Sequence, residues 1–277
     1  METQAYAKIN LTLDIVGRDS RGYHLLSSVF ARVSLADTVS LKSGGQGLTL
    51  ICSDPNIPTD ERNLCVKAAN AFLAEFAFEE RDFQIDLVKK IPSCAGLGGG
   101  SSDAAAVLRL LCEHFGISPQ EKRVHAVALS VGADVPFFLQ GGVCLAEGVG
   151  ERLTPLQPLP EYTVLLAKAN EGASTPEVYR LFDELTVSQL PATAQFLTAL
   201  RNDSDIIPHL SNHLTAATAK LCPSVVRLKE NLLRAGALGA EMSGSGTAVY
   251  GLFASEKEAK NAVKIIDAEF CEICRFI

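Results

Sequence analysis

The sequence has no tryptophan and only two methionines, and none of its apolar runs approaches the roughly 20 residues that a membrane-crossing helix needs. Its apolar runs have the length of a strand, as at Tyr162–Ala167. The first residues lack the basic region and long apolar stretch of a secretory signal. We therefore expect a cytoplasmic protein that has no membrane partner and keeps its cysteines reduced.

An excess of positive charge is missing too. Lysine and arginine total 25 against 32 aspartates and glutamates, which gives a net charge of −7. Nucleic-acid binders usually carry a basic face, so this balance argues against a nucleic-acid partner. Hydrophobic residues make up 47% of the 277, enough for one large or two moderate domains with a buried core.

The sequence also has no clear set of metal ligands. Its eight cysteines are scattered, and only Cys271 and Cys274 form a CxxC pair. A structural zinc site needs a second pair or nearby histidines, which this spacing does not supply. His209 and His213 are four residues apart but lack the glutamate of an HExxH motif. We expect no metal site, and thiols that are inert and buried.

Apolar periodicity predicts an α+β chain. Strands are predicted at residues 9–16, 27–35, 38–43, 82–91, 141–148 and 162–169, with a strand-turn-strand unit at 239–255. Helices are predicted at 61–76, 103–116, 119–131, 174–185 and 256–270, with a helical stretch around 192–235 and a short strand at the end. Three prolines in residues 154–161 mark a linker, so we expect two domains, at 1–154 and 155–277.

The strongest functional signal is the glycine-rich segment PSCAGLGGGSSD, between a predicted strand and a predicted helix. Glycines 98–100 allow positive φ angles and a close backbone approach to an anion. Unpaired amides at a helix start favour phosphate, and Ser101 or Ser102 can cap that helix and reach a phosphate. A Walker A loop requires a lysine directly before its serine, and this segment has none. The segment does not match the GxGxxG dinucleotide-binding motif either, because Ser101 occupies the position of the last glycine. The alternative is a serine-capped tight turn, for which fewer glycines suffice.

Three further features have ordinary structural explanations when taken singly. Lys8 and Asn10 share one face of the opening strand, where a lysine can simply protect a sheet edge. Asp134, in GADVPFF, is either a turn aspartate or a partly desolvated carboxylate that needs a partner. The glycine-rich segment Met242–Tyr250 is typical of a hairpin.

Together, the patterns K-x-N, PxxxGLGGGSSDAA, GADVP and SGSGTAV resemble the GHMP kinase superfamily over nearly the whole chain. The resemblance implies a two-domain fold, with a ribosomal protein S5 domain 2-like N-terminal domain that binds ATP and a ferredoxin-like C-terminal domain. GRDSRGYH (Gly17–His24) resembles the branch that phosphorylates a cytidine diphosphate-linked methylerythritol on its 2-hydroxyl, in the methylerythritol phosphate route to isoprenoids. Homoserine and mevalonate kinases are not expected to carry GYH at this place.

The resemblance implies that Lys8 and Asp134 form the catalytic pair. Asp134 would accept the proton of the substrate hydroxyl as it attacks the γ-phosphorus of ATP, and Lys8 would neutralise the developing charge. Phosphoryl transfer needs mainly positioning and electrostatics, which such a pair supplies. The alternatives are another GHMP kinase, such as a homoserine kinase, and a silent member that only binds nucleotide. Retention of both residues argues against the silent member.

The resemblance also implies ATP as co-substrate, with Mg²⁺ accompanying the nucleotide. Asn63 and Lys89 match positions near the adenosine. The loop that would carry the phosphates comprises Pro92, Ser93, Cys94, Ala95, Gly96, Leu97, Gly98, Gly99, Gly100, Ser101 and Ser102. Cys94 and Ala95 stand where the family often has more glycine. The glycines nearest the helix remain, so we expect the phosphate cradle to be kept.

For the cytidine end of the substrate, the resemblance implies an aromatic clamp. Tyr23 would stack on the cytosine, and His24 would hydrogen-bond the edge of the base. Tyr179 matches the second aromatic residue of the clamp, and Thr175 matches a nearby polar contact.

The rest of the substrate would be held by Asn10 and Asp134 near the transferred hydroxyl, and Gly244–Gly246 would close the site. The partners would then be small molecules only, ATP and the cytidyl substrate. We expect a monomer or a weak homodimer.

Overall fold

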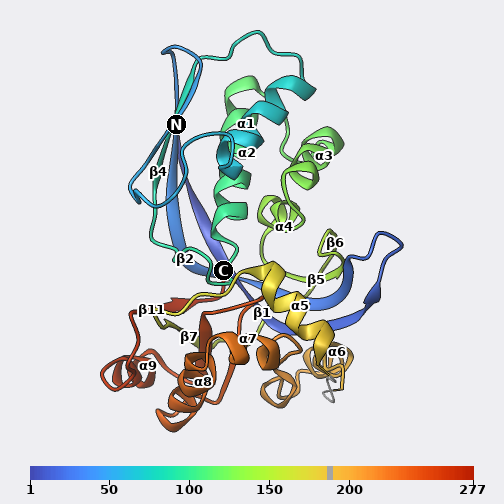
Figure 1. Ribbon diagram of the computed structural model, residues 1–277, viewed down its shortest axis with the longest axis vertical. Helices are drawn as coiled ribbons and strands as arrows, with labels where there is room; N and C mark the ends of the chain where they lie inside the picture. Colours follow the sequence, from blue (N-terminus) through green and yellow to red (C-terminus); the bar gives the residue numbers. More distant parts are fainter. Residues whose placement is uncertain (186–189) are drawn as a thin grey trace. The chain divides into compact units, whose positions relative to one another are not determined.

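The computed structural model describes residues 1–185 and 190–277, which form two compact units (Figure 1). Neither unit is one continuous stretch of chain. The first comprises Met1–Ala7, Leu35–Ser93 and Gly98–Gly141, and the second comprises Lys8–Ser34, Cys94–Leu97 and Gly142–Ile277. Two long neighbouring strands, β1 (Glu2–Arg18) and β2 (His24–Ser43), each contribute residues to both units.

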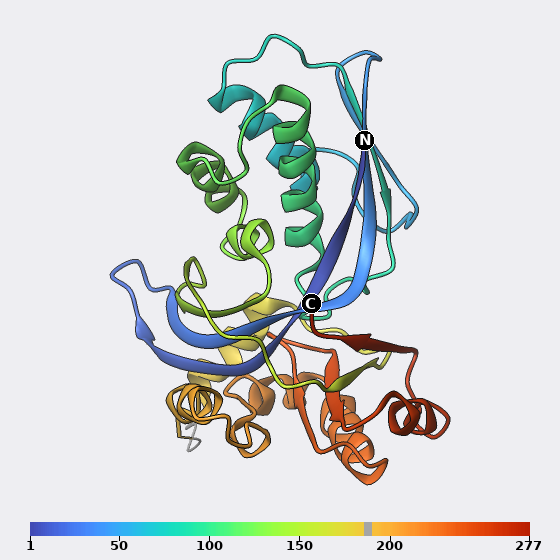
Figure 2. The same ribbon diagram turned by 180° about the vertical axis from the view of Figure 1, so that it is seen from behind.

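The first unit has a layer of strands and a layer of helices. β2 pairs antiparallel with β4 (Phe83–Val88), and β4 pairs in parallel with β3 (Leu48–Cys52). The helices lie on one side of these strands (Figures 1 and 2). They are α1 (Leu64–Glu75), α2 (Gly99–Phe115), α3 (Lys122–Val131) and α4 (Val135–Gln140).

Strand β4 shows how the two layers join. Its residues alternate, with Phe83, Ile85 and Leu87 buried, as expected for a strand that has one face on the core. The Phe83 ring lies 6.0 Å from that of Phe115 near the end of α2. Gly116 ends this helix as its C-cap in the left-handed region, at φ 66°, which glycine adopts without strain.

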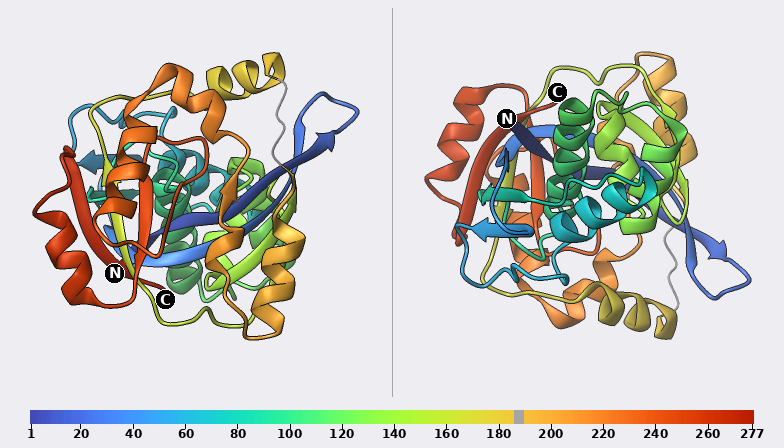
Figure 3. Two further views of the ribbon diagram at one scale, coloured as in Figure 1. Left: turned by 90° about the horizontal axis from the view of Figure 1, so that it is seen from below. Right: turned by 90° about the horizontal axis from the view of Figure 1, so that it is seen from above.

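The second unit is built on a four-stranded antiparallel sheet in the order β11-β7-β10-β9. The strands are β7 (Thr163–Lys168), β9 (Gly239–Met242), β10 (Val249–Phe253) and β11 (Phe270–Arg275). Helices α8 (Ser224–Arg234) and α9 (Glu256–Val263) pack on them, and Figure 3 shows α9 beside β11 at the red end of the chain. This sequence of strands and helices with this strand order is ferredoxin-like, as predicted for the C-terminal domain.

The remaining elements of the second unit surround its parts of β1 and β2. β5 (Val143–Gly148) pairs antiparallel with both β2 and β6 (Arg152–Pro155), and β8 (Ser211–Asn212) pairs in parallel with β1. The other helices are α5 (Thr175–Glu184), α6 (Thr193–Arg201) and α7 (Thr215–Leu221), with a 3₁₀ turn at Ile207–His209.

Several predicted boundaries are wrong. The strands predicted at 27–35 and 38–43 are one strand, β2, because β5 pairs with its first half and β4 with its second. The helix predicted to reach residue 270 ends at Val263, because Phe270 already pairs with Lys168 in the sheet. The short helix α4 was not expected. Within the described residues, no helix has the length and apolar character needed to span a membrane.

Candidate functional site

The glycine-rich segment is divided between the two units. Residues 94–97 belong to the second unit and residues 98–102 to the first. In the second unit, Gly96 lies against the turn that follows β9: a Cβ atom on Gly96 would stand 2.0 Å from the carbonyl oxygen of Ser243. The Ser243 hydroxyl donates to Gly96 O at 2.9 Å, and Ala248 N donates to Ala95 O at 3.0 Å. Segments about 150 residues apart in sequence therefore form one surface, which only glycine at position 96 permits.

Lys8 and Asn10 lie in the same unit, and β1 buries both side chains. Lys8 Nζ donates to Asn10 Oδ1 at 2.6 Å and lies 4.9 Å from the centre of the Phe30 ring. Asn10 Nδ2 donates to the Ser28 hydroxyl at 2.9 Å. The backbone N–H of Lys8 donates to Leu97 O at 3.0 Å, so this strand also holds the end of the 94–97 segment. Lys8 and Asn10 are thus brought together, as their spacing predicts.

In the first unit, the glycine-rich segment opens helix α2. Gly98 is the N-cap at φ 71°, and Ser102 N already donates to Gly98 O. No side chain caps this helix. Its first amides therefore have no partner within the helix, which is the arrangement that binds an anion. The exposed Gly100 keeps the approach open.

Two details of the sequence prediction are corrected here. The helix begins at Gly99 rather than Asp103, so neither Ser101 nor Ser102 is its cap. Positive φ occurs at Gly96 and Gly98, whereas Gly99 and Gly100 are helical, because the helix propagates from the left-handed turn at Gly98. Cys94, with φ 51°, adopts a backbone angle that glycine usually takes.

Lys89 is held by two carboxylates in the first unit. Its ammonium donates to Asp37 Oδ2 and, at 2.7 Å, to Asp103 Oδ2. Burial opposes the charge on Lys89, yet the two carboxylates raise its pKa. Burial also raises the pKa of Asp103 from 3.8 to about 8. The sequence analysis missed both carboxylates.

Asn63, also predicted near the adenosine, has a structural task. Its Oδ1 accepts from Cys65 N at 2.8 Å as the N-cap of α1, and its Nδ2 donates to Pro58 O at 2.8 Å. The nucleotide roles assigned to Asn63 and Lys89 remain predictions.

Asp134 is half-buried at the N-cap position of α4, and its carboxylate makes no capping bond to that helix. The far part of α4 is fixed by Arg109, whose guanidinium donates to Phe138 O at 2.7 Å and to Gln4 O at 2.9 Å. A carboxylate that does not cap its own helix can serve as a proton acceptor, and that role remains a prediction.

Part of the predicted cytosine clamp comes together in the second unit. The rings of His24 and Tyr179 lie 4.7 Å apart at 32°, and Thr175 shares a 2.7 Å hydrogen bond with Ser245. Tyr23 is 61% exposed, with the Arg21 guanidinium 5.2 Å from its ring centre.

Asp183 is a member of this cluster that the sequence analysis missed. It lies 2.7 Å from His24 Nε2 and pairs with Arg18. The hydrogen bonds from Arg18 and His24 outweigh partial burial and lower the pKa of Asp183. The ionised carboxylate therefore orients the His24 ring.

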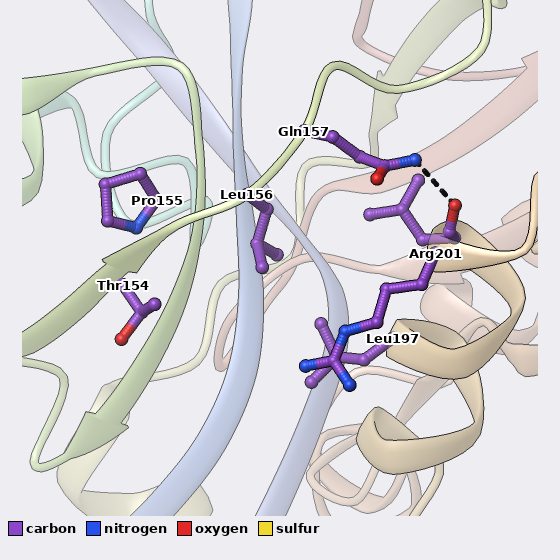
Figure 4. Close-up of a pocket in the computed structure, with 7 residues that line it drawn as sticks. Thr154, Pro155, Leu156, Gln157, Leu197 and Arg201 are labelled. Carbon is purple, nitrogen blue, oxygen red and sulfur yellow. Dashed lines mark hydrogen bonds between the residues drawn. The ribbon is translucent and has the colours of Figure 1, made fainter.

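In the described part of the chain, the predicted site residues coincide neither with a metal-binding group nor with the pocket beside α6. The described residues contain no group of three or more His, Cys, Asp or Glu side chains that could hold a metal ion. Cys271 and Cys274 are three apart on β11 and so point to opposite faces of the strand. A pocket of about 240 Å³ in the second unit is formed by the 154–157 segment and α6, where Gln157 donates to Leu200 O (Figure 4). No predicted site residue lines it.

Two family descriptions match the chain, GHMP kinases N terminal domain at residues 63–142 and GHMP kinases C terminal at residues 190–272. They leave the boundary predicted at 154/155 open. The 4-diphosphocytidyl-2-C-methyl-D-erythritol kinase of Clostridium botulinum (strain Eklund 17B / Type B) is 36% identical over 275 residues, which covers 99% of this chain and 98% of that protein. The kinase of the same name from Clostridium beijerinckii is 36% identical over 255 residues and 91% of each chain.

Among solved structures, a crystal structure of 4-(cytidine 5'-diphospho)-2C-methyl-D-erythritol kinase superposes with a TM-score of 0.83 at 35% identity, over 100% of this chain and 99% of that one. A homoserine kinase from Cytophaga hutchinsonii reaches a TM-score of 0.76 at 20% identity, over 100% and 94%, which shows a shared fold alone. The chain belongs to the GHMP kinase superfamily, within its family of 4-diphosphocytidyl-2-C-methyl-D-erythritol kinases.

Proposed function

We propose that this chain transfers the γ-phosphoryl group of ATP to the 2-hydroxyl of 4-diphosphocytidyl-2-C-methyl-D-erythritol, giving the 2-phosphate and ADP. The reaction belongs to the methylerythritol phosphate route to isopentenyl diphosphate. The observation that carries this proposal is the 36% identity to a kinase of that name over 99% of the chain. The GRDSRGYH segment supports the cytidyl branch over a homoserine kinase.

ATP binds through the start of α2. The unpaired amides of the first turn and the positive end of the helix dipole both favour the phosphate groups. Mg²⁺, when bound together with the nucleotide, would be held by the phosphate groups and would neutralise part of their negative charge. This mode of binding requires no resident cluster of protein ligands.

Asp134 acts as general base and accepts the proton of the substrate hydroxyl. Lys8 supplies a buried positive charge for the transferring phosphoryl group, and Asn10, to which Lys8 donates, hydrogen-bonds the substrate near the reacting oxygen. A loose phosphoryl-transfer transition state asks the protein mainly for such positioning and charge stabilisation.

The cytidine end is bound by His24 and Tyr179, with Thr175 as a polar neighbour and Tyr23 closing on the base from an exposed position. Gly244–Gly246 lines the site in the second unit. The protein works as a cytoplasmic monomer or weak homodimer with the domain division at 154/155.

A coupled assay of ADP release tests the proposal, with the cytidyl substrate and homoserine offered in turn. Turnover of the cytidyl substrate alone supports it, and preference for homoserine contradicts it. The role of Asp134 is tested by Asp134→Asn, which keeps the size of the side chain but cannot take the proton. We expect kcat to fall roughly 10²–10⁴-fold with ATP affinity nearly unchanged. Asp86→Asn, on strand β4, is the matched control.

A further inference from the structure

Three charged side chains are buried together under the start of α2. Asp37 is fully buried, and the side chains of Lys89 and Asp103 are 8% and 3% exposed. Lys89 lies between the two carboxylates and donates to both. An ammonium has three N–H donors, so two are used here. We call Asp37, Lys89 and Asp103 the lysine clamp.

Asp37 fixes the backbone that leads into the glycine-rich segment. Its Oδ1 accepts from the N–H groups of Lys90, at 2.5 Å, and Ile91, at 2.8 Å. The same carboxylate holds the Lys89 ammonium through Oδ2. One side chain on β2 therefore sets both the path of residues 89–91 and the direction of the lysine.

The charges of the clamp balance only if one carboxylate carries a proton. Two carboxylates against one ammonium leave a net negative charge, which is costly to bury. Asp37 Oδ1 has two backbone donors, whereas no partner for Asp103 Oδ1 lies among the residues that the structure describes. Burial and the neighbouring Asp37 carboxylate raise the pKa of Asp103 to about 8, which agrees with a proton on Asp103 at neutral pH. A neutral Asp103 leaves the positive end of α2 uncancelled for an anionic ligand.

The clamp lies beside the first residue of the helix. A Cβ atom on Gly99 would stand 3.3 Å from Lys89 Nζ and 3.0 Å from Ile91 Cγ2. Lys89 and Ile91 therefore fill the space beside Gly99. Asp103 belongs to α2, so its bond to Lys89 ties the first turns of the helix to the residues that follow β4.

We propose that Asp37 and Asp103 are positioning residues which, by clamping Lys89 under Gly99, set the affinity of the α2 start for the ATP phosphates. The inference rests on the proposed role of this helix start in ATP binding. Neither carboxylate acts on the substrate hydroxyl. They therefore contribute to the binding of ATP and not to the binding of the cytidyl substrate.

The test compares Asp103→Ala with Asp103→Asn in the full chain, using calorimetry for ATP and the coupled assay for both substrates. Asp103→Ala removes the acceptor of Lys89 and should weaken ATP binding roughly 3–30-fold without changing KM for the cytidyl substrate. Asp103→Asn keeps an uncharged acceptor and should stay within about twofold of the wild type. If Asp103→Ala does not fold, Asp103→Ser takes its place. Asp86→Asn, a lysine-paired aspartate on β4, is the control.

Wild-type ATP affinity in folded Asp103→Ala overturns the clamp. So does an Asp103→Asn variant as weak as Asp103→Ala, because the ionised carboxylate would then be required. A loss that falls equally on both substrates points to a general structural role and also overturns it. A wild-type chain that binds no ATP instead overturns the proposed function, so the two failures are distinguishable.

Discussion

Two segments rich in glycine and serine look alike in the sequence and are supported by different chemistry. Residues 98–102, the helix-start segment, rest on the buried ions of the lysine clamp. Residues 242–247, the turn segment, join β9 to β10, and three of their backbone carbonyls accept hydrogen bonds from neutral side chains. Asn212 Nδ2 donates to Met242 O at 2.9 Å and to Gly244 O at 2.8 Å, and the Thr218 hydroxyl donates to Ser245 O at 3.1 Å.

The difference shows why glycine content alone does not identify a phosphate cradle. In the helix-start segment the backbone amides that precede Ser102 have no partner within the helix, so an anion can use them. In the turn segment three backbone carbonyls already accept from side chains, and glycine there serves close packing. The segments should therefore respond differently to added side-chain bulk, to pH and to loss of one supporting side chain.

The largest change in stability is expected from Gly96→Ala, which disrupts the packing of Gly96 against the turn segment. The new Cβ would stand 2.0 Å from Ser243 O, and φ is +74°. We expect the free energy of unfolding to fall by roughly 2–5 kcal/mol, from backbone strain and overpacking together. Gly47→Ala is the control, because Gly47 has the same φ and open space around it, and it should cost only roughly 1–2 kcal/mol. Urea unfolding measures both, and equal losses would contradict the clash.

The next prediction concerns the pH dependence of stability, which should be seen for the helix-start segment and not for the turn segment. Burial raises the pKa of Asp103 from 3.8 to about 8, so the folded state keeps a proton that the unfolded state releases in this range. The stability that this proton contributes is complete below about pH 4 and is lost as the pH rises to about 8. Asparagine cannot titrate. The stability of Asp103→Asn relative to the wild type should therefore rise through this window, by roughly 1.4 kcal/mol for each pH unit.

Urea unfolding at several pH values checks this second expectation. Asp86→Asn is the control, because the hydrogen bond from Lys42 lowers the pKa of Asp86 and keeps it ionised across the window. Its difference from the wild type should stay flat. A flat difference for Asp103→Asn would mean that Asp103 is ionised in the folded protein.

A smaller effect is expected from Asn212→Ala, which removes the neutral support of the turn segment. The buried carbonyls of Met242 and Gly244 lose their donor, and Leu214 N loses the Asn212 oxygen that it donates to at 2.9 Å. We expect a loss of about 1–2 kcal/mol that does not depend on pH. Asn202→Ala, at an exposed position, should be near neutral. A pH-dependent loss would show that the turn segment also rests on a titrating group.

The sequence predicted the helices and strands better than the buried side chains that hold the site residues in place. Alternation along residues 83–88 and the helical stripe of residues 104–111 are local signals, and both elements are present. The pairing of Lys8 with Asn10 was also visible, since residues two apart share a strand face. Boundaries went wrong where a distant strand decided them, as at Phe270, whose partner Lys168 is a hundred residues away.

The supporting side chains were missed because their role depends on contacts remote in sequence. Asp37 acts through residues 89–91, and Asp183 acts through His24. A weak signal existed for two of them: Asp37 is a lone acid inside an apolar strand, and Asp103 follows directly on the serines at a helix start. Because a buried charge needs a partner, the sequence could have predicted that each of these aspartates is paired. It could not have identified the partner residue.

The smallest effect on stability, and the sharpest test of the comparison, is expected from Gly100→Ala in the helix-start segment. Gly100 is helical and exposed, and an added Cβ would meet only Leu64 Cδ1 at 3.7 Å, an ordinary contact. Alanine favours a helix over glycine, so the free energy of unfolding should change by less than about 1 kcal/mol, in the stabilising direction. ATP affinity should nevertheless fall, because the methyl group would stand beside the amides that, in the proposed function, bind the phosphates. Calorimetry that shows tighter or unchanged ATP binding would mean that this glycine, like those of the turn segment, serves packing rather than the anion.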